Sequence, residues 1–180
     1  MTQKPFPVLH TRRLRLRPIK ASEIETFNDI SHYAGKEVHA TDQGATLLQR
    51  LRRDFQEGKA IHWGIQLKSE ARLIGTCGFY RGFADREGEV GYVLLPPYRG
   101  RGLMREAVRA MIDYGFQELQ LYRIVAYTSD DHVASVRLLQ DLGFDRVLDR
   151  PDSILVKFVV YNPYFEQESE PAEDLNENDL

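Results

Sequence analysis

The sequence predicts a single domain that combines α+β and α/β features, with a mixed central sheet of about six to seven strands and helices on both faces. Its 180 residues, 42% hydrophobic and 28% charged, suit one ordinary globular domain. Three β-rich segments separated by short polar turns indicate an antiparallel meander. A strand, a glycine turn, an amphipathic helix and a further strand then follow in the order of a parallel βαβ unit.

The amino-terminal part is expected to contribute one strand. Residues 1–10 are predicted to be a lead-in to a domain of residues 11–165. Leu14 and Leu16 alternate with arginines, which is the period of a half-buried strand, and Pro18 ends it. An arginine-rich strand is also compatible with nucleic-acid binding, but the segment lacks interleaved aromatic residues and the net charge is −3. We therefore expect no nucleic-acid partner.

Two helices are expected next. Residues 21–30 carry Ser22 as the predicted N-cap and acidic residues in the first turn. Residues 45–57 place four apolar side chains on one helical face, and Gly58 follows as the C-terminal signal. These four are Leu47, Leu48, Leu51 and Phe55.

The helical pattern is lost between these helices, over residues 31–43. Irregular loops of this kind often carry substrate contacts. Tyr33 and His39 are the candidate substrate-binding residues in this segment.

The meander is expected to begin with residues 61–67 and 72–80, joined by a hairpin turn at 68–71. Gly75 and Gly78 interrupt the second strand. A β-bulge or the close approach of another backbone would explain glycine at these positions.

A phosphate-binding loop is predicted after the third strand. Pro96 and Pro97 end the strand, and Gly100 and Gly102 permit a sharp turn before a helix of residues 103–116. The unpaired N–H groups and the positive dipole end of this helix would hold a pyrophosphate. The expected binding residues are Leu94, Leu95, Arg99, Gly100, Arg101, Gly102, Leu103 and Met104.

Two common nucleotide loops do not fit this segment. A P-loop requires Lys and Ser or Thr after its second glycine, where this chain has Leu103 and Met104. A dinucleotide fingerprint requires a third glycine and an acidic residue on the next strand, and both are missing. The hexapeptide alone is also compatible with a plain turn between a strand and a helix.

The segments after the long helix complete the predicted βαβ unit. Residues 122–128 read as a buried strand, and a helix of residues 133–142 ends at Gly143. A hairpin of 145–150 with 153–161 follows. Ligands of such units bind beyond the carboxyl ends of the strands, which places the site at residues 94–102 and 128–135.

The segment Pro97 to Gly102 resembles the signature of the GNAT superfamily of acetyl-coenzyme A dependent N-acetyltransferases: Gln or Arg, two residues, Gly, one residue, Gly or Ala. Pro97 departs from the first position. The strand Thr11 to Arg17 is similar to the opening strand of the ribosomal-protein N-terminal acetyltransferase branch. The resemblance extends over residues 11–161, including the Leu-Gly-Phe that ends at Phe144.

This resemblance implies a V-shaped splay between the two central parallel strands, and acetyl-CoA as the cofactor. It also implies a primary amine as acceptor, either a small molecule or a protein N-terminus. The two amino-terminal helices and their connection would form one wall of the acceptor site. A non-catalytic protein that senses acetyl-CoA remains an alternative.

The chain departs from the family pattern in its last helix. His132 occupies the position of an Asn, and Leu139 occupies that of the Tyr that usually acts as general acid. Ser135 remains as a candidate proton donor to the leaving thiolate, or as a helix-capping residue. His132 would either bind cofactor amides or lie exposed at the helix start. The short turn at residues 150–153, where the ribosomal-protein branch inserts a longer segment, leaves the acceptor open.

Glu89 is the candidate catalytic base. It precedes the apolar run that leads to the glycine loop, and an acid beside apolar surface should have a raised pKa. Pairing with Arg72 or Arg81 at the sheet surface is the alternative. The oxyanion is expected to bind a backbone N–H near Leu94 or Leu95, freed by a bulge in the strand.

Cysteine content and hydropathy limit the compartment and the partners. A single cysteine, Cys77, excludes an internal disulfide and a cysteine-based metal cluster, and no metal site is expected. No apolar run approaches the ~20 residues of a membrane span, and the N-terminus has no signal-peptide core. We expect a cytoplasmic monomer or homodimer without a membrane partner. Residues 166–180 contain seven acids and no base, which predicts a disordered tail.

Overall fold

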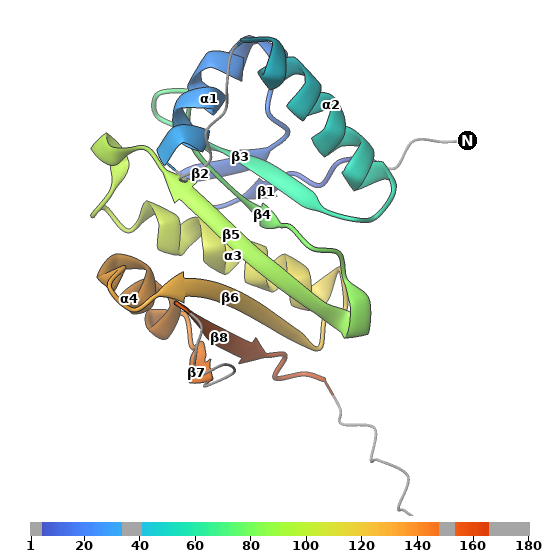
Figure 1. Ribbon diagram of the computed structural model, residues 1–180, viewed down its shortest axis with the longest axis vertical. Helices are drawn as coiled ribbons and strands as arrows, with labels where there is room; N and C mark the ends of the chain where they lie inside the picture. Colours follow the sequence, from blue (N-terminus) through green and yellow to red (C-terminus); the bar gives the residue numbers. More distant parts are fainter. Residues whose placement is uncertain (1–4, 34–40, 148–153, 166–180) are drawn as a thin grey trace, which may run out of the picture.

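A computed structural model describes residues 5–33, 41–147 and 154–165. These residues form one mixed sheet in the order β1-β2-β3-β4-β5-β6-β8-β7, with helices on both faces (Figure 1). The predicted fold class is confirmed, and the sheet has eight strands where six to seven were expected. The additional strand is the two-residue β1 (Leu9–His10).

Residues 5–10 belong to the domain, so the prediction of a lead-in is wrong for this part. β1 pairs antiparallel with β2 (Leu14–Arg17), and β2 pairs with β3 (Ile61–Leu67). The ring of Phe6 packs against Phe55 and Trp63, with centroids 4.7 and 6.1 Å apart. Burial of aromatic surface holds this segment in place.

The two amino-terminal helices are α1 (Ile24–Tyr33) and α2 (Thr41–Gln56). Ser22 is not an N-cap, because it lies inside a 3-10 turn, η1 (Ala21–Glu23), whose N-cap is Lys20. The Glu23 carboxylate accepts the Lys20 N–H and satisfies this turn. The expected irregular segment of residues 31–43 is shorter than predicted at both ends, since α1 continues to Tyr33 and α2 begins at Thr41.

The meander consists of β3, β4 (Arg72–Phe79) and β5 (Glu87–Leu94). Both reasons proposed for its glycines are found. The register with β3 shifts between Ile65 and Gln66, which is a bulge beside Gly75. A Cβ on Gly75 would lie 2.4 Å from the Val93 carbonyl oxygen, and one on Gly78 would lie 2.3 Å from that of Ile61. The first distance reflects the approach of β5, the second that of β3.

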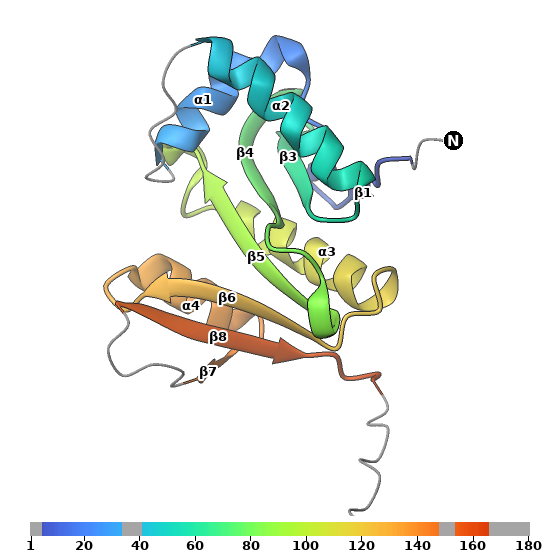
Figure 2. The same ribbon diagram turned by 45° about the vertical axis from the view of Figure 1, so that its right-hand side comes forward.

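The βαβ unit consists of β5, α3 (Leu103–Gln117) and β6 (Arg123–Ser129). β5 and β6 pair in parallel from Glu87 with Arg123 to Val90 with Ala126, and no further. The rest of the two strands diverges toward the loop before α3, which gives the V-shaped splay (Figure 2).

The carboxyl-terminal part contains α4 (Val133–Asp141), β7 (Asp145–Val147) and β8 (Leu155–Tyr161), with β8 between β6 and β7. Helices α1 and α2 cover one face of the sheet, and α3 and α4 lie on the other (Figure 2). None of the helices in the described ranges combines the length and apolar character that a bilayer-spanning helix requires. The predicted tail, 166–180, and the turn at 150–153 lie outside the described residues.

Candidate active site

The loop before α3 has the backbone geometry of an anion site. Gly100 and Gly102 have φ values of +71° and +68°, which favour glycine, and Gly102 is the N-cap of α3. The helical hydrogen bonds begin with the Glu106 N–H, which donates to the Gly102 carbonyl oxygen at 3.2 Å. Within the described residues, the N–H groups from Gly100 to Arg105 donate to no protein acceptor. They are available to an anion at the positive end of α3.

The predicted phosphate loop, residues 99–104, is open beside Gly100. A Cβ built on Gly100 would meet no atom within 4 Å, so the loop faces open space. Arg99 and Arg101 are exposed beside it. The Arg99 Nε donates to the Leu94 carbonyl oxygen at 2.8 Å and ties the loop to the end of β5. The pyrophosphate of acetyl-CoA would be held here by the N–H groups of residues 100–105 and by these two arginines.

The backbone of β5 supplies further donors inside the splay. Tyr80 N–H donates to the Glu89 oxygen and Leu95 N–H to the Ile74 oxygen, so the odd-numbered residues of β5 bond to β4. In an antiparallel pair the intervening residues point the other way, so the N–H groups of Tyr92 and Leu94 point toward β6. Since β6 has already diverged there, these N–H groups face the splay.

Of the two residues expected to supply the oxyanion donor, Leu94 and Leu95, only Leu94 has an N–H group that is free within the described part of the chain. The Leu95 N–H is not free, because it donates to Ile74 at 2.9 Å. The register between β4 and β5 also runs without a shift from Gly75 with Leu94 to Phe79 with Val90, so no bulge frees a donor there. Divergence of the two parallel strands exposes the Leu94 N–H instead.

Ser135 lies at the site and has a partner that the sequence reasoning missed. Its hydroxyl oxygen is 2.7 Å from the Tyr92 hydroxyl oxygen, and Ser135 is buried. Ser135 stands in the first turn of α4 but does not cap it, because His132 is the N-cap and no side-chain cap bond is formed. The signal in the sequence was the period-2 spacing of Tyr92 with Val90 and Leu94, which places a phenol on the inner face of β5.

His132 occupies the start of α4. Its side chain is exposed, and its Nδ1 is 3.5 Å from the Thr128 hydroxyl oxygen, a weak contact. This position at the carboxyl end of β6 lies on the same edge of the sheet as the phosphate loop. A contact between His132 and cofactor amides stays a prediction.

Glu89 projects from the opposite face of β5. Side chains alternate along a strand, and Tyr92 reaches α4, so Glu89 faces α1 and α2. Its carboxylate lies 3.4 Å from Arg81 Nη1, which is the pairing considered as the alternative. Burial nevertheless raises the pKa of Glu89; the charge of Arg81 lowers it and that of Glu87 raises it further. Desolvation outweighs the effect of the exposed arginine, so the pKa of Glu89 is raised although Glu89 pairs with Arg81. Its role as the catalytic base stays a prediction.

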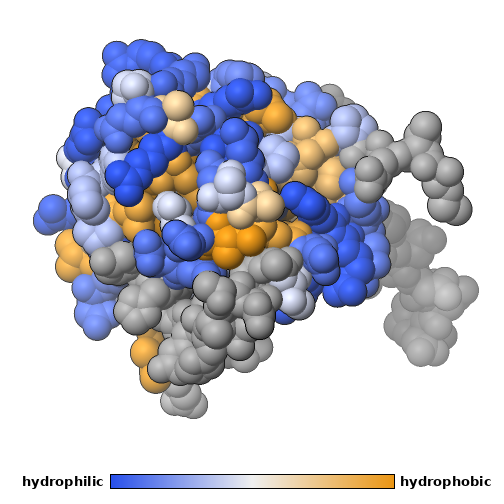
Figure 3. Space-filling model, turned by 90° about the horizontal axis from the view of Figure 1, so that it is seen from above, coloured by the Kyte–Doolittle hydropathy of each residue, from blue (hydrophilic) through white to orange (hydrophobic). Residues whose placement is uncertain are grey.

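The two candidate substrate residues lie at the edge of what is described. Tyr33 is the last residue of α1, and its side chain is outside the described part of the chain. His39 lies outside the described residues altogether. On the side of the molecule formed by α1 and α2, hydrophobic residues show between hydrophilic ones (Figure 3).

A helix N-terminus with N–H groups that are free among the described residues, inward-facing amides in a strand splay and an acid with a raised pKa are the features expected of a transferase that uses an acyl-coenzyme A donor. Residues 13–145 match the family model described as Acetyltransferase (GNAT) domain. The chain therefore belongs to the GNAT acetyltransferase family, and it is an acetyl-CoA-dependent N-acetyltransferase.

Two relatives agree with this family, and a solved structure shares the fold. YoaA of Bacillus subtilis (strain 168), an uncharacterized N-acetyltransferase, is 34% identical over 149 residues, which cover 78% of this chain and 84% of YoaA. The spermidine N(1)-acetyltransferase of Escherichia coli (strain K12) is 30% identical over 157 residues, which cover 77% of this chain and 75% of that protein. The ribosomal-protein-S5-alanine acetyltransferase structure from Vibrio fischeri aligns with a TM-score of 0.75 and 23% identity, covering 89% of this chain and 99% of its own.

Proposed function

We propose that the acceptor is a primary amine, of a small molecule or of a protein N-terminus, and that Glu89 removes its proton. The observation that carries this proposal is the position of Glu89: a partly buried carboxylate with a raised pKa in the strand that leads to the phosphate loop. An amine is protonated near neutral pH and must lose a proton before it can attack. A base that titrates closer to neutrality than an ordinary Glu suits that task.

The two faces of β5 support separate sites for donor and acceptor. Tyr92 and Ser135 lie on the face of α3 and α4, together with the start of α3. Glu89 lies on the face of α1 and α2. Donor and acceptor would therefore enter from opposite faces of the sheet and meet in the splay between β5 and β6.

Each residue then has one task in the transfer. Acetyl-CoA, when bound, supplies the activated acetyl group. Glu89 accepts the proton of the ammonium group, directly or through water. The Leu94 N–H donates to the acetyl oxygen as its negative charge grows. The Ser135 hydroxyl, hydrogen-bonded to Tyr92, gives a proton to the sulfur that leaves.

The alternative of a non-catalytic sensor rested on Leu139, which occupies the position where the family pattern has a tyrosine. Tyr92 supplies a phenol next to Ser135 from a different element, so the lack of a tyrosine on α4 does not leave the site without a proton donor. A catalytic function is therefore better supported than a non-catalytic sensor function.

A panel of acceptors tests the proposal. Thiol release from acetyl-CoA would be measured with spermidine, with peptides that have a free N-terminus, and with the same peptides N-terminally blocked but containing lysine. We expect turnover with at least one primary amine, and the three arms separate a polyamine from a protein N-terminus and from a lysine side chain. Matched tertiary amines should give no turnover. If coenzyme A binds but no primary amine is acetylated, the proposed acceptor class is wrong.

A further inference from the structure

Arg13 connects the amino-terminal strand to the first turn of α3. It lies just before β2, and its Nε donates to Glu106 Oε2 at 2.7 Å. Its backbone N–H donates to Oε1 of the same carboxylate at 2.7 Å, and the Thr11 hydroxyl donates to Oε1 at 2.5 Å. The Glu106 carboxylate is thus held by three donors from a segment 93 and 95 positions away in the sequence.

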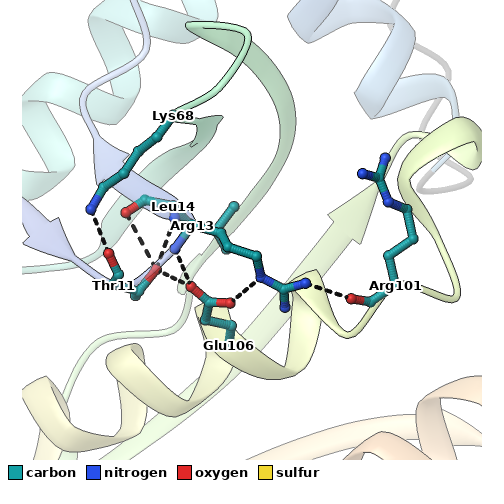
Figure 4. Close-up of polar contacts among 6 residues, drawn as sticks. All are labelled: Thr11, Arg13, Leu14, Lys68, Arg101 and Glu106. Atoms are coloured by element: carbon teal, nitrogen blue, oxygen red, sulfur yellow. Dashed lines mark hydrogen bonds and ion pairs between the residues drawn. The ribbon is translucent and has the colours of Figure 1, made fainter.

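The same guanidinium also holds the phosphate loop. Arg13 Nη1 donates to the Arg101 carbonyl oxygen at 2.9 Å, and Nη2 lies 3.6 Å from the Cβ position of Gly102. Figure 4 shows Arg13 between Glu106 and Arg101, with the Arg101 side chain directed away from the cluster. A single side chain therefore fixes the loop backbone relative to the helix that it precedes.

Arg13 balances the negative charge of Glu106 beside the candidate anion site. A carboxylate in the first turn of α3 stands close to the N–H groups that would bind a pyrophosphate, and like charges repel. Burial alone would raise the pKa of Glu106, but the hydrogen bonds from Thr11 and Arg13 outweigh burial and lower it. Glu106 is therefore ionised at neutral pH, and Arg13 supplies the balancing charge.

We propose that Arg13 is a positioning residue that sets the affinity for acetyl-CoA, by holding the Arg101 carbonyl and by neutralising Glu106 beside the anion site. This inference rests on the proposed assignment of the loop of residues 99–104 as the pyrophosphate site. Arg13 does not need to contact the ligand itself.

Arg17, the last residue of β2, offers a matched control. It pairs with Glu23 at 2.5 Å and donates to Gln66 at 2.8 Å, and its side chain is more buried than that of Arg13. Among the described residues, its hydrogen-bond partners lie in η1, in β3 and at Pro18, and none of them belongs to the phosphate loop. Loss of Arg17 should therefore lower fold stability without changing the loop.

The experiment compares Arg13→Met with Arg17→Met in the full chain. Coenzyme A affinity would be measured by calorimetry, thermal unfolding by circular dichroism, and KM and kcat with an active acceptor. Arg13→Met should weaken coenzyme A binding by about 10-fold or more, the effect of losing charge-assisted hydrogen bonds. KM for acetyl-CoA should rise in parallel, with kcat at saturation changed less. Arg17→Met should lower Tm and leave coenzyme A affinity within about 2-fold.

Two further variants isolate the mechanism. Arg13→Lys keeps the charge but not the fork of donors, and it should recover part of the affinity and serve if Arg13→Met does not fold. Adding Glu106→Gln to Arg13→Met should also recover affinity, because the unbalanced carboxylate is removed. Equal coenzyme A affinity for Arg13→Met and the parent would overturn the inference.

The variant Gly102→Glu distinguishes an error about the role of Arg13 from an error about the position of the phosphate loop. If Gly102→Glu abolishes binding and Arg13→Met does not, only the role of Arg13 is wrong. If neither variant changes coenzyme A binding, the assignment of the phosphate loop is wrong.

Discussion

The hydroxyl oxygens of Tyr92 and Ser135 lie 2.7 Å apart and join β5 to α4 at the open part of the splay. Burial raises the pKa of Tyr92, and the hydrogen bond with Ser135 offsets only part of that effect. The phenol therefore keeps its proton at neutral pH. A protonated phenol can donate to Ser135 when the serine gives up its own proton.

The first prediction concerns this pair. Tyr92→Phe and Ser135→Ala should each lower kcat by about 10²-fold, a typical contribution of a positioned proton donor. If the hydroxyls act as one unit, the double variant should be little worse than either single variant. Coenzyme A affinity, measured by calorimetry, should change little. Losses that multiply in the double variant would show that the two hydroxyls act independently.

The second prediction concerns Glu89. Glu89→Gln keeps the shape of the side chain and removes its basicity, so kcat should fall by about 10²-fold while coenzyme A affinity is retained. The acidic limb of the pH profile of kcat/KM should disappear as well. Unchanged kcat between pH 6 and 9 in a folded variant would exclude Glu89 as the base.

The third prediction concerns Arg81 and Glu87, whose charges shift the pKa of Glu89 in opposite directions. The charge of Arg81 lowers the pKa of Glu89 and the charge of Glu87 raises it. The active form of Glu89 is the deprotonated one, so activity rises as the pH passes its pKa. Arg81→Met should therefore move the acidic limb to higher pH, and Glu87→Gln should move it to lower pH. Shifts of the same sign in both variants would contradict this electrostatic account.

The fourth prediction tests the phosphate loop with a matched pair of glycines. Gly102 and Gly58 have nearly the same φ, +68° and +69°, so a side chain at either position costs ~1–2 kcal/mol of backbone strain. Gly102→Glu additionally places a negative charge at the start of α3 and should abolish coenzyme A binding. Gly58→Glu, at the end of α2, should lower Tm without weakening binding. Equal binding by the two variants would place the pyrophosphate elsewhere.

The fifth prediction concerns close packing in the meander. A Cβ on Gly78 would meet the Ile61 backbone at 2.3 Å, whereas one on Gly64 would first meet side-chain atoms of Leu73 and Ile19 at 2.7 and 3.0 Å. Side chains adjust more easily than a paired strand does. Gly78→Ala should therefore lower the free energy of unfolding by ~1–3 kcal/mol, and by more than Gly64→Ala. Urea unfolding of both variants measures the difference.

The sequence by itself determined the elements whose signals are local. Alternating apolar residues predict the strands, and helical spacing predicts α3, because both periods follow from backbone geometry. Pro96, Gly100 and Gly102 predicted the turn before α3 that is the candidate phosphate loop, since these residues restrict or release the backbone at their own positions. Glu89 was singled out as the candidate base in the same way, as an acid next to an apolar run.

The tertiary structure decided which distant residues meet. Tyr92 and Ser135 are 43 positions apart, and Arg13 and Glu106 are 93 apart; no local period links either pair. Their contacts depend on the end of the β5–β6 pairing at Val90 and on the packing of α3 beside the first strands. The free amide inside the splay likewise depends on the pairing register of β5 with β4. Contacts of this kind are set when the sheet and its helices bury their apolar faces together, so the structure assigned Leu94, and not Leu95, as the exposed donor.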